Sequence, residues 1–390
     1  MDSTRYLIVG SGLTADAACK GIRERDPDGR IVVVGDEPHP PYLRPPLSKA
    51  LWKGDEESTV WRGTAELGVE LRLGRRIVAL DLERGEARDD KDETYGYDKL
   101  LLATGGRPRR LTFGGDSVIY FRTLDDYRHL RALANGGARC CVIGGGFIGS
   151  EIAAALALND CPVTMVLPES GICARVFPEE LSTALNDYYR SHGVEVLTGV
   201  SVTAIEQHGT GTQVMLGYGR PLEADVVVAG IGIVPNAELA ADAGLPVANG
   251  IVVDAYGRVG GREDVFAAGD VARFPVAALA TDMRVEHEDH AKSHGHQVGA
   301  NMAGADAPYE HLPFFYSDLF DLGYEAIGEV DARLDTLIDW TGLEGEGTIT
   351  YLDGARRPRG LLLWNRFGRL DAARELILAA TPIAEGATVG

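Results

Sequence analysis

The sequence lacks long apolar runs, and this absence limits where the protein can work. Its 390 residues contain no apolar stretch that approaches the ~20 residues a helix needs to cross a bilayer. The N-terminus also lacks the charged and apolar regions of a secretory signal, because an apolar strand already begins at Tyr6. We therefore expect a cytoplasmic protein with no membrane partner.

Positive charge is also scarce. The chain carries 38 lysines and arginines against 58 aspartates and glutamates, which gives a formal net charge of −20. Such a surface repels polyanions, so nucleic acid is not an expected partner. An acidic protein partner would need a local basic patch to overcome the same repulsion.

Cysteine is rare, and its spacing matches no redox or metal motif. The five cysteines form no C-x-x-C pair and no metal-ligand pattern. We expect most of them to be small buried apolar residues. They are Cys19, Cys140, Cys141, Cys161 and Cys173.

The N-terminal region has the pattern of a strand, a glycine turn, a helix and a second strand. An apolar run at Tyr6–Val9 stops at Gly10 and Gly12, in a G-x-G-x-x-A turn, and a second apolar run covers 31–34. Gly10 allows a tight turn, and Gly12 lets the backbone approach a pyrophosphate at the helix N-terminus. Asp36 follows the second strand, where an acid would bind a ribose 2′-hydroxyl. One such motif is weak, and an ordinary strand-to-helix turn is the alternative.

The same pattern recurs in the middle of the chain. A strand at Cys140–Ile143 leads into Gly144–Gly149, a complete G-x-G-x-x-G, and then into an alanine-rich helix. Glu169 follows the next strand and lies twenty residues beyond the last glycine. An acid there favours a free 2′-hydroxyl, and so NADH over NADPH; no arginine follows immediately, and Arg175 is six residues further on.

Two such motifs in one chain are more informative than one. Each alone could be a tight turn, but together they predict two dinucleotides, one held permanently and one that visits. The segment Leu100–Leu102 resembles a return strand of the first sheet, and Ala103–Gly105 would be the turn after it. A further strand before Gly269 delivers Asp270 to a glycine turn, where it could bind a cofactor hydroxyl or cap a helix.

A proline-rich segment separates the first strand–helix–strand pattern from the rest. Its four prolines predict an extended chain up to Pro46, after which Ser48 and Lys49 can begin a helix. The segment also carries Arg44, so it places two cations just past the ribose acid. Taken alone, a proline-rich surface loop is the simpler interpretation.

Histidines early in the last third of the chain raise the question of a metal site. His287, His290 and His294 would share one face of a helix. The spacing is one residue short of the H-E-x-x-H motif, so we predict no metal. The better interpretation is a helix with acids in its first turn and its N-terminus directed at the cofactor.

From Pro308 the composition changes to a small α+β pattern. An aromatic segment at 314–318 leads into four expected strands, and a final helix closes the chain. The strands are expected at 323–330, 335–340, 347–352 and 360–365, and the helix at 371–379. The aromatic segment would form either core or the wall of a ligand pocket.

The sequence resembles the FAD- and NAD(P)H-dependent oxidoreductases of the glutathione-reductase fold, over essentially its whole length. Within them it is similar to the ferredoxin reductases of oxygenase systems, of the putidaredoxin reductase type, and to the flavoprotein core of apoptosis-inducing factor. The residues that carry the resemblance are Pro41–Lys49, Ala103–Pro108, Gly144–Glu151, Phe266–Asp270, Val285–His290, Ser317–Asp318 and Gly323–Gly328.

The resemblance implies an α/β protein with two Rossmann-like dinucleotide-binding domains, for FAD and NAD, and a small C-terminal α+β domain. The expected boundaries are 1–110 with 238–306 for FAD, 111–237 for NAD, and 307–390 for the C-terminal domain.

The resemblance also implies the binding residues. FAD would contact Gly10, Gly12, Leu13, Thr14, Asp36, Arg44, Lys49, Ile77, Ala103, Thr104, Gly105, Arg122, Gly269 and Asp270. NADH would contact Gly144, Gly146, Phe147, Ile148, Gly149, Glu151, Glu169 and Gly232. Glu286, His287, Glu288 and Tyr316 would lie near the flavin and the nicotinamide, and the family usually has a tryptophan where Tyr316 stands.

The implied chemistry is a hydride transfer from NADH to flavin N5. In the family, the lysine that matches Lys49 pairs with the glutamate that matches Glu151, beside that atom. Disulfide reductases of this fold carry a cysteine pair beside the flavin, but the matching segment Tyr42–Lys49 has none. Electrons should therefore pass directly to a small iron-sulfur acceptor of the ferredoxin or rubredoxin type.

Two other functions stay open for a monomer or homodimer of this kind. One is an NADH-dependent reductase of quinones or oxygen. The other is a slow redox sensor, similar to apoptosis-inducing factor, that changes its oligomeric state when it binds NADH.

Overall fold

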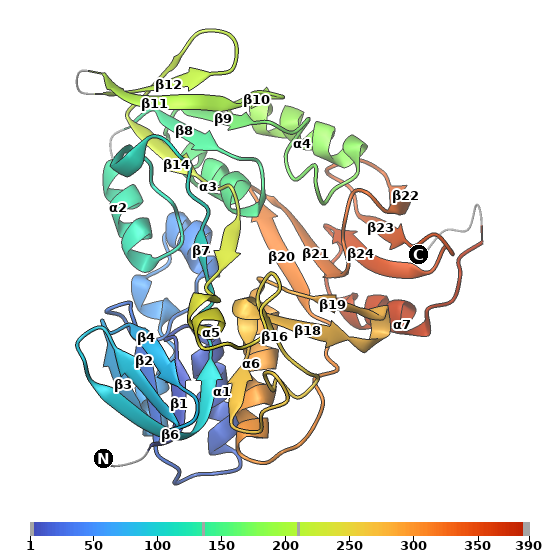
Figure 1. Cartoon of the computed structure of the whole chain (residues 1–390). Helices are drawn as coiled ribbons and strands as arrows, with labels where there is room; N and C mark the ends of the chain where they lie inside the picture. The colour runs from blue at the N-terminus through green and yellow to red at the C-terminus, as the bar shows by residue number, and fades with distance from the viewer. Residues whose placement is uncertain (1–3, 135–136, 209–210, 385–390) are drawn as a thin grey trace. The chain divides into compact units, whose positions relative to one another are not determined.

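The computed structural model describes residues 4–134, 137–208 and 211–384, and the chain forms two compact units (Figure 1). The first unit comprises Met1–Leu43, Ser58–Arg107 and Val234–Pro313. The second comprises Arg44–Glu57, Pro108–Ile233 and Phe314–Gly390. Both are therefore built from segments that are distant in the sequence. The three-domain division expected from the sequence stays a prediction.

A twisted sheet forms the centre of the first unit. Parallel pairing joins β3, β2, β1, β6 and β17, and β5 and β4 extend β6 in antiparallel fashion. Ile8 is paired with Val33 on one side and Leu101 on the other, so the predicted return strand is confirmed. The strands are β1 (Thr4–Val9), β2 (Ile31–Gly35), β3 (Glu70–Leu73), β4 (Ile77–Asp81), β5 (Glu86–Asp89), β6 (Thr94–Leu102) and β17 (Val265–Ala267).

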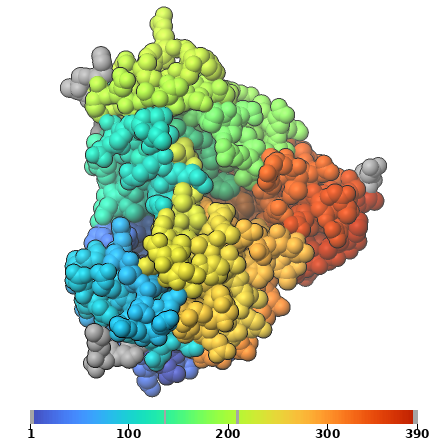
Figure 2. Space-filling model, viewed as in Figure 1, coloured from blue at the N-terminus to red at the C-terminus, as the bar shows by residue number. Residues whose placement is uncertain are grey.

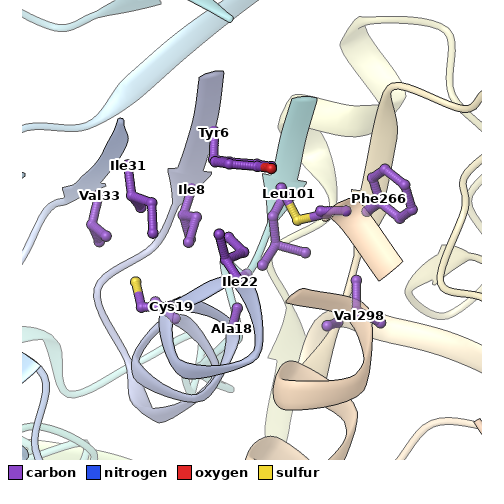
Figure 3. Packing of buried hydrophobic residues seen from close by; sticks show 14 residues of the cluster. Tyr6, Ile8, Ala18, Cys19, Ile22, Ile31, Val33, Leu101, Phe266 and Val298 are labelled. Atoms are coloured by element: carbon purple, nitrogen blue, oxygen red, sulfur yellow. The ribbon is translucent and has the colours of Figure 1, made fainter. Parts of the chain in front are cut away.

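Two helices pack together against this sheet, α1 (Leu13–Arg23) and α6 (Glu288–Met302). Apolar side chains of the strands and of both helices form one buried cluster, which includes Ile22, Phe266 and Val298 (Figure 3). The two helix backbones approach closely, because a Cβ atom added at Gly299 would lie 2.2 Å from the Ala18 carbonyl oxygen. Only a residue without a side chain fits there.

Short elements complete the first unit. A three-stranded sheet has the order β16, β18, β19, and the helix α5 precedes it. Their bounds are α5 (Glu238–Asp242), β16 (Ile251–Val252), β18 (Ala272–Val276) and β19 (Thr281–Met283). Two further short strands, β7 (Gly106–Pro108) and β15 (Ile233–Pro235), pair with each other. The chain leaves the first unit at β7 and returns to it at β15.

The second unit contains a parallel sheet of the order β10, β9, β8, β14 and an antiparallel sheet of β11, β12 and β13. The parallel strands are β8 (Cys140–Ile143), β9 (Val163–Leu167), β10 (Val194–Thr198) and β14 (Val226–Ala229). The antiparallel strands are β11 (Val202–His208), β12 (Gly211–Leu216) and β13 (Leu222–Ala224). The helices are α2 (Leu124–Ala134), α3 (Phe147–Ala157) and α4 (Glu179–Ser191). The loop between β12 and β13 projects from the surface and carries the exposed Tyr218 (Figure 2).

A five-stranded antiparallel sheet and the helix α7 (Leu370–Ala379) form the C-terminal part of the second unit. The strand order is β20, β21, β24, β23, β22. Their bounds are β20 (Phe314–Leu319), β21 (Leu322–Gly328), β22 (Asp335–Trp340), β23 (Gly347–Leu352) and β24 (Pro358–Trp364). The four expected strands and the helix are present, and the aromatic segment expected to lead into them is itself a fifth strand.

The proline-rich segment differs from its prediction. Instead of staying extended up to Pro46, the chain turns into a 3-10 helix at Pro45–Ser48, and a second one covers Ala50–Lys53. The reason is that the fixed φ of proline suits the first turn of a helix, where no backbone N–H is needed.

No helix in the described ranges is long and apolar enough to cross a membrane. The predicted cellular location is not tested by this finding and stays a prediction.

Candidate active site

The first glycine turn has the shape that a bound pyrophosphate needs. Gly10 ends β1 with a φ of +111°, and a Cβ atom there would lie 2.2 Å from the Ala103 carbonyl oxygen. Gly12 is the N-cap of α1, and nothing lies within 4 Å of the position where its Cβ would be. The turn is therefore closed on the side of β6 and open at the helix N-terminus, where backbone N–H groups attract anions.

Asp36 and the loop after β6 lie at the same edge of this sheet as the glycine turn. Asp36 follows β2 directly, is 60% exposed and forms an ion pair with Arg76 at 3.5 Å. The loop after β6 is held in place because the Thr104 hydroxyl donates to the Asn236 carbonyl at 2.7 Å and Asn236 Nδ2 donates back at 2.9 Å. Since β1, β2, β6 and β17 are parallel neighbours, their carboxyl ends meet at one edge.

The loop that follows β17 lies at this edge too and carries Asp270. Gly269 has a φ of +73°, and a Cβ atom there would lie 2.1 Å from the Thr14 hydroxyl, so the turn is packed against α1. The Gly269 N–H donates to His294 Nδ1 at 3.4 Å, and Arg284 donates to the Asp270 carbonyl at 3.2 Å. His294 was not among the site residues predicted from the sequence; its position seven residues after His287 on the helix was the available signal.

The helix α6 starts soon after the Asp270 loop in the sequence, and its N-terminal residues include the predicted acids. His287 is the N-cap, Glu288 forms an ion pair with Lys292, and Glu286 pairs with Arg284 at 2.7 Å. His290 and His294 lie fully buried further along the helix, with ring centroids 4.8 Å apart.

Burial determines the charge of these two histidines. It lowers the pKa of His294 to about 3 and lowers the pKa of His290 well below its usual value, and at His290 the neighbouring His294 ring adds to the lowering. Both rings are therefore neutral at neutral pH. No group of three or more possible metal ligands occurs among the residues that the structure describes.

The second glycine turn repeats this geometry in the second unit. Gly144 ends β8 with a φ of +101°, and a Cβ atom there would lie 2.5 Å from the Gly230 carbonyl oxygen. Gly146 is the N-cap of α3 with open space around its Cβ position, and Gly149 packs against the Gly144 carbonyl. Phe147 and Ile148 begin the helix, and the Phe147 ring lies 5.2 Å from that of Phe315. This turn also fits a pyrophosphate.

The acid predicted for this second site has a partner that the sequence did not predict. Glu169 lies two residues beyond β9, and Arg175 binds it through Nε at 2.8 Å and Nη2 at 2.6 Å. Gly232, with a φ of +92°, follows β14, the strand that pairs with β8, and its carbonyl accepts a hydrogen bond from the Arg109 N–H at 2.9 Å.

The two predicted catalytic residues form a buried ion pair in the second unit. Lys49 Nζ lies 2.6 Å from Glu151 Oε1, and the side chains are only 11% and 5% exposed. Two hydroxyls also donate hydrogen bonds to the Glu151 carboxylate: Ser48 donates to Oε2 at 2.5 Å and Ser317 donates to Oε1 at 2.5 Å. The Tyr316 ring centroid lies 5.8 Å from Lys49 Nζ. A buried charge of this kind is stable only when it is paired and hydrogen-bonded, and here both conditions hold.

Sequence analysis missed the two serines because they come from separate elements. Ser48 ends the 3-10 helix Pro45–Ser48, Glu151 lies in α3, and Ser317 lies in β20, the strand that was not predicted. The run of aromatic residues at 314–316, a residue type enriched in strands, was the available signal for that strand.

The remaining predicted residues occupy separate places. Arg44 Nη1 donates to the Arg122 carbonyl at 2.9 Å, so these two are joined within the second unit. Ile77 is buried at the start of β4, in the first unit, and Leu13 begins α1.

Two parallel sheets, each with an open glycine turn at a helix N-terminus and an acid beyond the next strand, define a protein that binds two dinucleotides. The chain belongs to the pyridine nucleotide-disulphide oxidoreductase family, whose model matches residues 4–295. A second model, the C-terminal region of mitochondrion-associated apoptosis-inducing factor, matches residues 298–344.

Individual relatives are similar along nearly the whole chain. The ferredoxin–NAD(+) reductase component of the anthranilate 1,2-dioxygenase system of Burkholderia cepacia is 37% identical over 97% of this chain and 95% of that protein. Mitochondrial apoptosis-inducing factor 1 of Dictyostelium discoideum is 32% identical over 97% of this chain and 79% of that protein. The covalent putidaredoxin reductase–putidaredoxin complex superposes with a TM-score of 0.91 at 30% identity, over 97% of this chain and 94% of that chain.

The predicted family, fold class and enzyme class are therefore confirmed. The protein is a flavoprotein reductase that uses FAD and NAD(P)H. The open turns at Gly12 and Gly146 fit these two nucleotides, because a backbone without side chains lets a pyrophosphate approach the helix N-terminus.

Proposed function

We propose that the protein takes electrons from NADH and delivers them, through FAD, to a small iron-sulfur protein of the ferredoxin or rubredoxin type. The observation that carries this proposal is the buried Lys49–Glu151 ion pair, with both carboxylate oxygens also bound by serine hydroxyls. Two similar proteins support the acceptor class, since one is a ferredoxin–NAD(+) reductase component and the other is putidaredoxin reductase in complex with putidaredoxin.

The binding residues are assigned by unit. FAD would be held in the first unit by the turns at Gly10–Thr14, Ala103–Gly105 and Gly269–Asp270, with Asp36 on the ribose. Arg44 and Arg122 stay predictions from the family resemblance. NADH would be held in the second unit by Gly144–Gly149 and by Glu169 and Gly232. Bound FAD supplies a two-electron acceptor for the hydride of NADH that can release electrons singly.

The chain's own contribution is a fixed positive charge. Glu151 holds the Lys49 ammonium group in one position, and the two serines orient the carboxylate so that this position is retained. A cation held in place stabilises the negative charge that would develop on the flavin during reduction better than a mobile cation does. The reason is that a fixed cation does not have to move when the charge appears. The N-terminus of α6, near Glu288, would add a second positive potential.

The cysteines support an electron path without sulfur. All five are free and buried, and burial raises the pKa of Cys19, Cys140, Cys141 and Cys173 to about 12. Thiols of this kind react poorly, since the thiolate is the reactive form. Electrons would therefore pass to an external acceptor directly.

The test of this proposal is to mix the FAD-loaded protein with NADH in the absence of oxygen and then to offer acceptors. We expect the yellow flavin absorbance to bleach, and turnover to be faster with a ferredoxin or rubredoxin than with a quinone or oxygen. Failure of NADH to bleach the flavin would overturn the first half of the proposal, and turnover with quinone alone would overturn the second.

A second candidate function has its own support. The match of residues 298–344 to the C-terminal region of apoptosis-inducing factor, together with the Dictyostelium relative, favours a slow reductase of quinone or oxygen, or a redox sensor. Such a sensor would change its oligomeric state when reduced by NADH. Light scattering with and without NADH, under oxygen-free conditions, distinguishes this function from the first.

A further inference from the structure

We propose that Cys140 and Cys161 form a redox-sensitive thiol pair, which hydrogen peroxide converts reversibly into a disulfide. The sequence did not predict this pair, because the second glycine turn and α3 separate the two cysteines along the chain. The inference goes beyond the proposed function, since the disulfide would form whichever acceptor takes the electrons of NADH.

Strand pairing brings the two cysteines together at the amino-terminal end of β8 and β9. Cys140 is the first residue of β8, and its N–H donates to the carbonyl of Pro162, the residue after Cys161, at 2.8 Å. The two thiols form a hydrogen bond with each other. Each Sγ also lies 3.3 Å from a backbone carbonyl oxygen, that of Ala138 for Cys140 and that of Ala134 for Cys161. Both sulfur atoms are therefore held beside each other.

Cys161 is the better nucleophile of the two. Burial raises the pKa of its thiol, but the hydrogen bond with Cys140 and the positive charge of Arg131 oppose this effect. Arg131 is held nearby, because its guanidinium group donates to the side chain of Asn159. At Cys140, by contrast, burial and the neighbouring Cys161 thiol raise the pKa to about 12, so Cys140 keeps its proton.

A surface cavity gives a small oxidant access to the pair. Its volume is about 290 Å³, and Cys140 contributes to its lining. The exposed residues Arg139, Glu195 and Glu223 line it as well, so it opens to solvent. Because Arg139 is neutralised by a bidentate ion pair with Asp225, the two glutamates leave the opening negatively charged. Such an opening repels anionic oxidants but admits a small neutral peroxide.

The oxidation conserves atoms and electrons. The Cys161 thiolate attacks one oxygen of hydrogen peroxide, the O–O bond breaks, and the leaving hydroxide recovers the proton that Cys161 had lost. Cys161 is then a sulfenic acid. The Cys140 sulfur attacks the Cys161 sulfur, the S–O bond breaks, and the Cys140 proton leaves with the hydroxyl group as a second water. Two thiols thus lose two electrons, and one peroxide gains them.

Peptide mapping of the FAD-loaded, folded protein tests the inference. After incubation with hydrogen peroxide and alkylation of the remaining thiols, we expect one disulfide, between Cys140 and Cys161, which dithiothreitol reverses. The oxidised protein should unfold at a temperature about 5 °C higher than the reduced protein, because the cross-link closes a loop that contains the second glycine turn and α3 and so restrains the unfolded chain.

Three variants locate the effect. Cys140→Ala and Cys161→Ala should lose both the disulfide and the shift in unfolding temperature. Cys141→Ala should keep both, because side chains alternate across a strand and Cys141 packs instead in a buried apolar cluster with Ile143 and Val227. Thermal unfolding of each variant in dithiothreitol shows that it folds before its oxidation is measured.

Three results would overturn the inference. One is that both thiols stay free in the folded, peroxide-treated protein and join only after it is denatured. Another is a mapped disulfide that joins other cysteines. The third is oxidation of Cys161 to a sulfenic or sulfinic acid while Cys140 stays a free thiol, since the second attack would then have failed. None of these measurements uses NADH or an electron acceptor, so the proposed function can fail without affecting them.

Discussion

At the scale of single residues, Glu151 determines the character of the candidate active site. Its carboxylate is nearly buried and meets one ammonium group and two hydroxyls, which come from Lys49, Ser48 and Ser317. The cost of burying such a charge is high, so each lost partner should have a measurable effect.

Lys49→Met should slow flavin reduction by NADH about 10- to 100-fold, the range typical of removing one electrostatic stabiliser. The flavin should still bind, because the glycine turns of the first unit are untouched. Stopped-flow absorbance at the flavin band measures the rate, and Lys53→Met is the matched control, since Lys53 is exposed at the end of the 3-10 helix whose N-cap is Lys49. An unchanged rate in Lys49→Met would reject the assigned role.

Ser317→Ala should lower the free energy of unfolding by about 2 kcal/mol, because a hydrogen bond to a charged group is lost in a buried place. It should also slow flavin reduction, since Glu151 would hold Lys49 less firmly. Chemical denaturation and stopped-flow absorbance measure the two effects. Ser201 is exposed, and its backbone carbonyl accepts a hydrogen bond from the Gly217 N–H, which the substitution leaves in place. Ser201→Ala should therefore change neither the free energy of unfolding nor the rate of flavin reduction.

At the scale of elements, the packing of α1 against α6 positions two of the loops proposed to hold FAD. The N-terminus of α1 is the glycine turn at Gly12, and α6 holds the Gly269 turn through His294. The close contact between the helix backbones therefore fixes the distance between these loops.

Gly299→Ala should destabilise the first unit by about 2 kcal/mol. Alanine favours a helix by about 1 kcal/mol over glycine, but the added methyl would overlap a backbone atom that cannot move alone, and overpacking typically costs about 1 to 3 kcal/mol or more. Thermal unfolding and FAD retention measure the effect. Gly96→Ala in β6, where nothing lies within 4 Å of the Cβ position, is the control, and equal losses in both variants would contradict this explanation.

The same scale shows what the sequence could and could not predict. Both strand–turn–helix–strand patterns are local, so glycine spacing and apolar runs predicted them and the acids that follow. The sequence did not predict the strand β20, because three consecutive aromatic residues lack the apolar–polar alternation of a half-buried strand. The serines around Glu151 depend on contacts between separate elements, which spacing alone does not contain. The Arg175–Glu169 pair depends on how the single loop between β9 and α4 folds back on itself.

At the scale of the whole molecule, acid should destabilise the protein below about pH 6.5. Burial depresses the pKa of His294 to about 3 and that of His290 well below normal, so the folded chain binds fewer protons than the unfolded chain in this range. Stability is therefore fully present above the ordinary histidine pKa and is lost as the pH falls, by up to ~1.4 kcal/mol per pH unit for each such histidine.

Urea denaturation at pH 7.5, 6.0 and 5.0 measures this loss. His294→Gln keeps a side-chain acceptor for the Gly269 N–H and should flatten the pH dependence, whereas His192→Gln, at an exposed position, should not. A pH dependence that is the same in all three proteins would exclude the buried histidines as its cause.

The strand β17 and the helix α6 come late in the chain, yet β17 pairs with β6 and α6 covers α1. On the ribosome, the first hundred residues emerge without the segments that complete their sheet and bury their apolar helix face. This half-formed nucleotide fold must persist through the synthesis of more than a hundred further residues. A nascent chain arrested before Val265 should consequently be a chaperone client that captures no flavin, and release of the full-length polypeptide should precede cofactor loading.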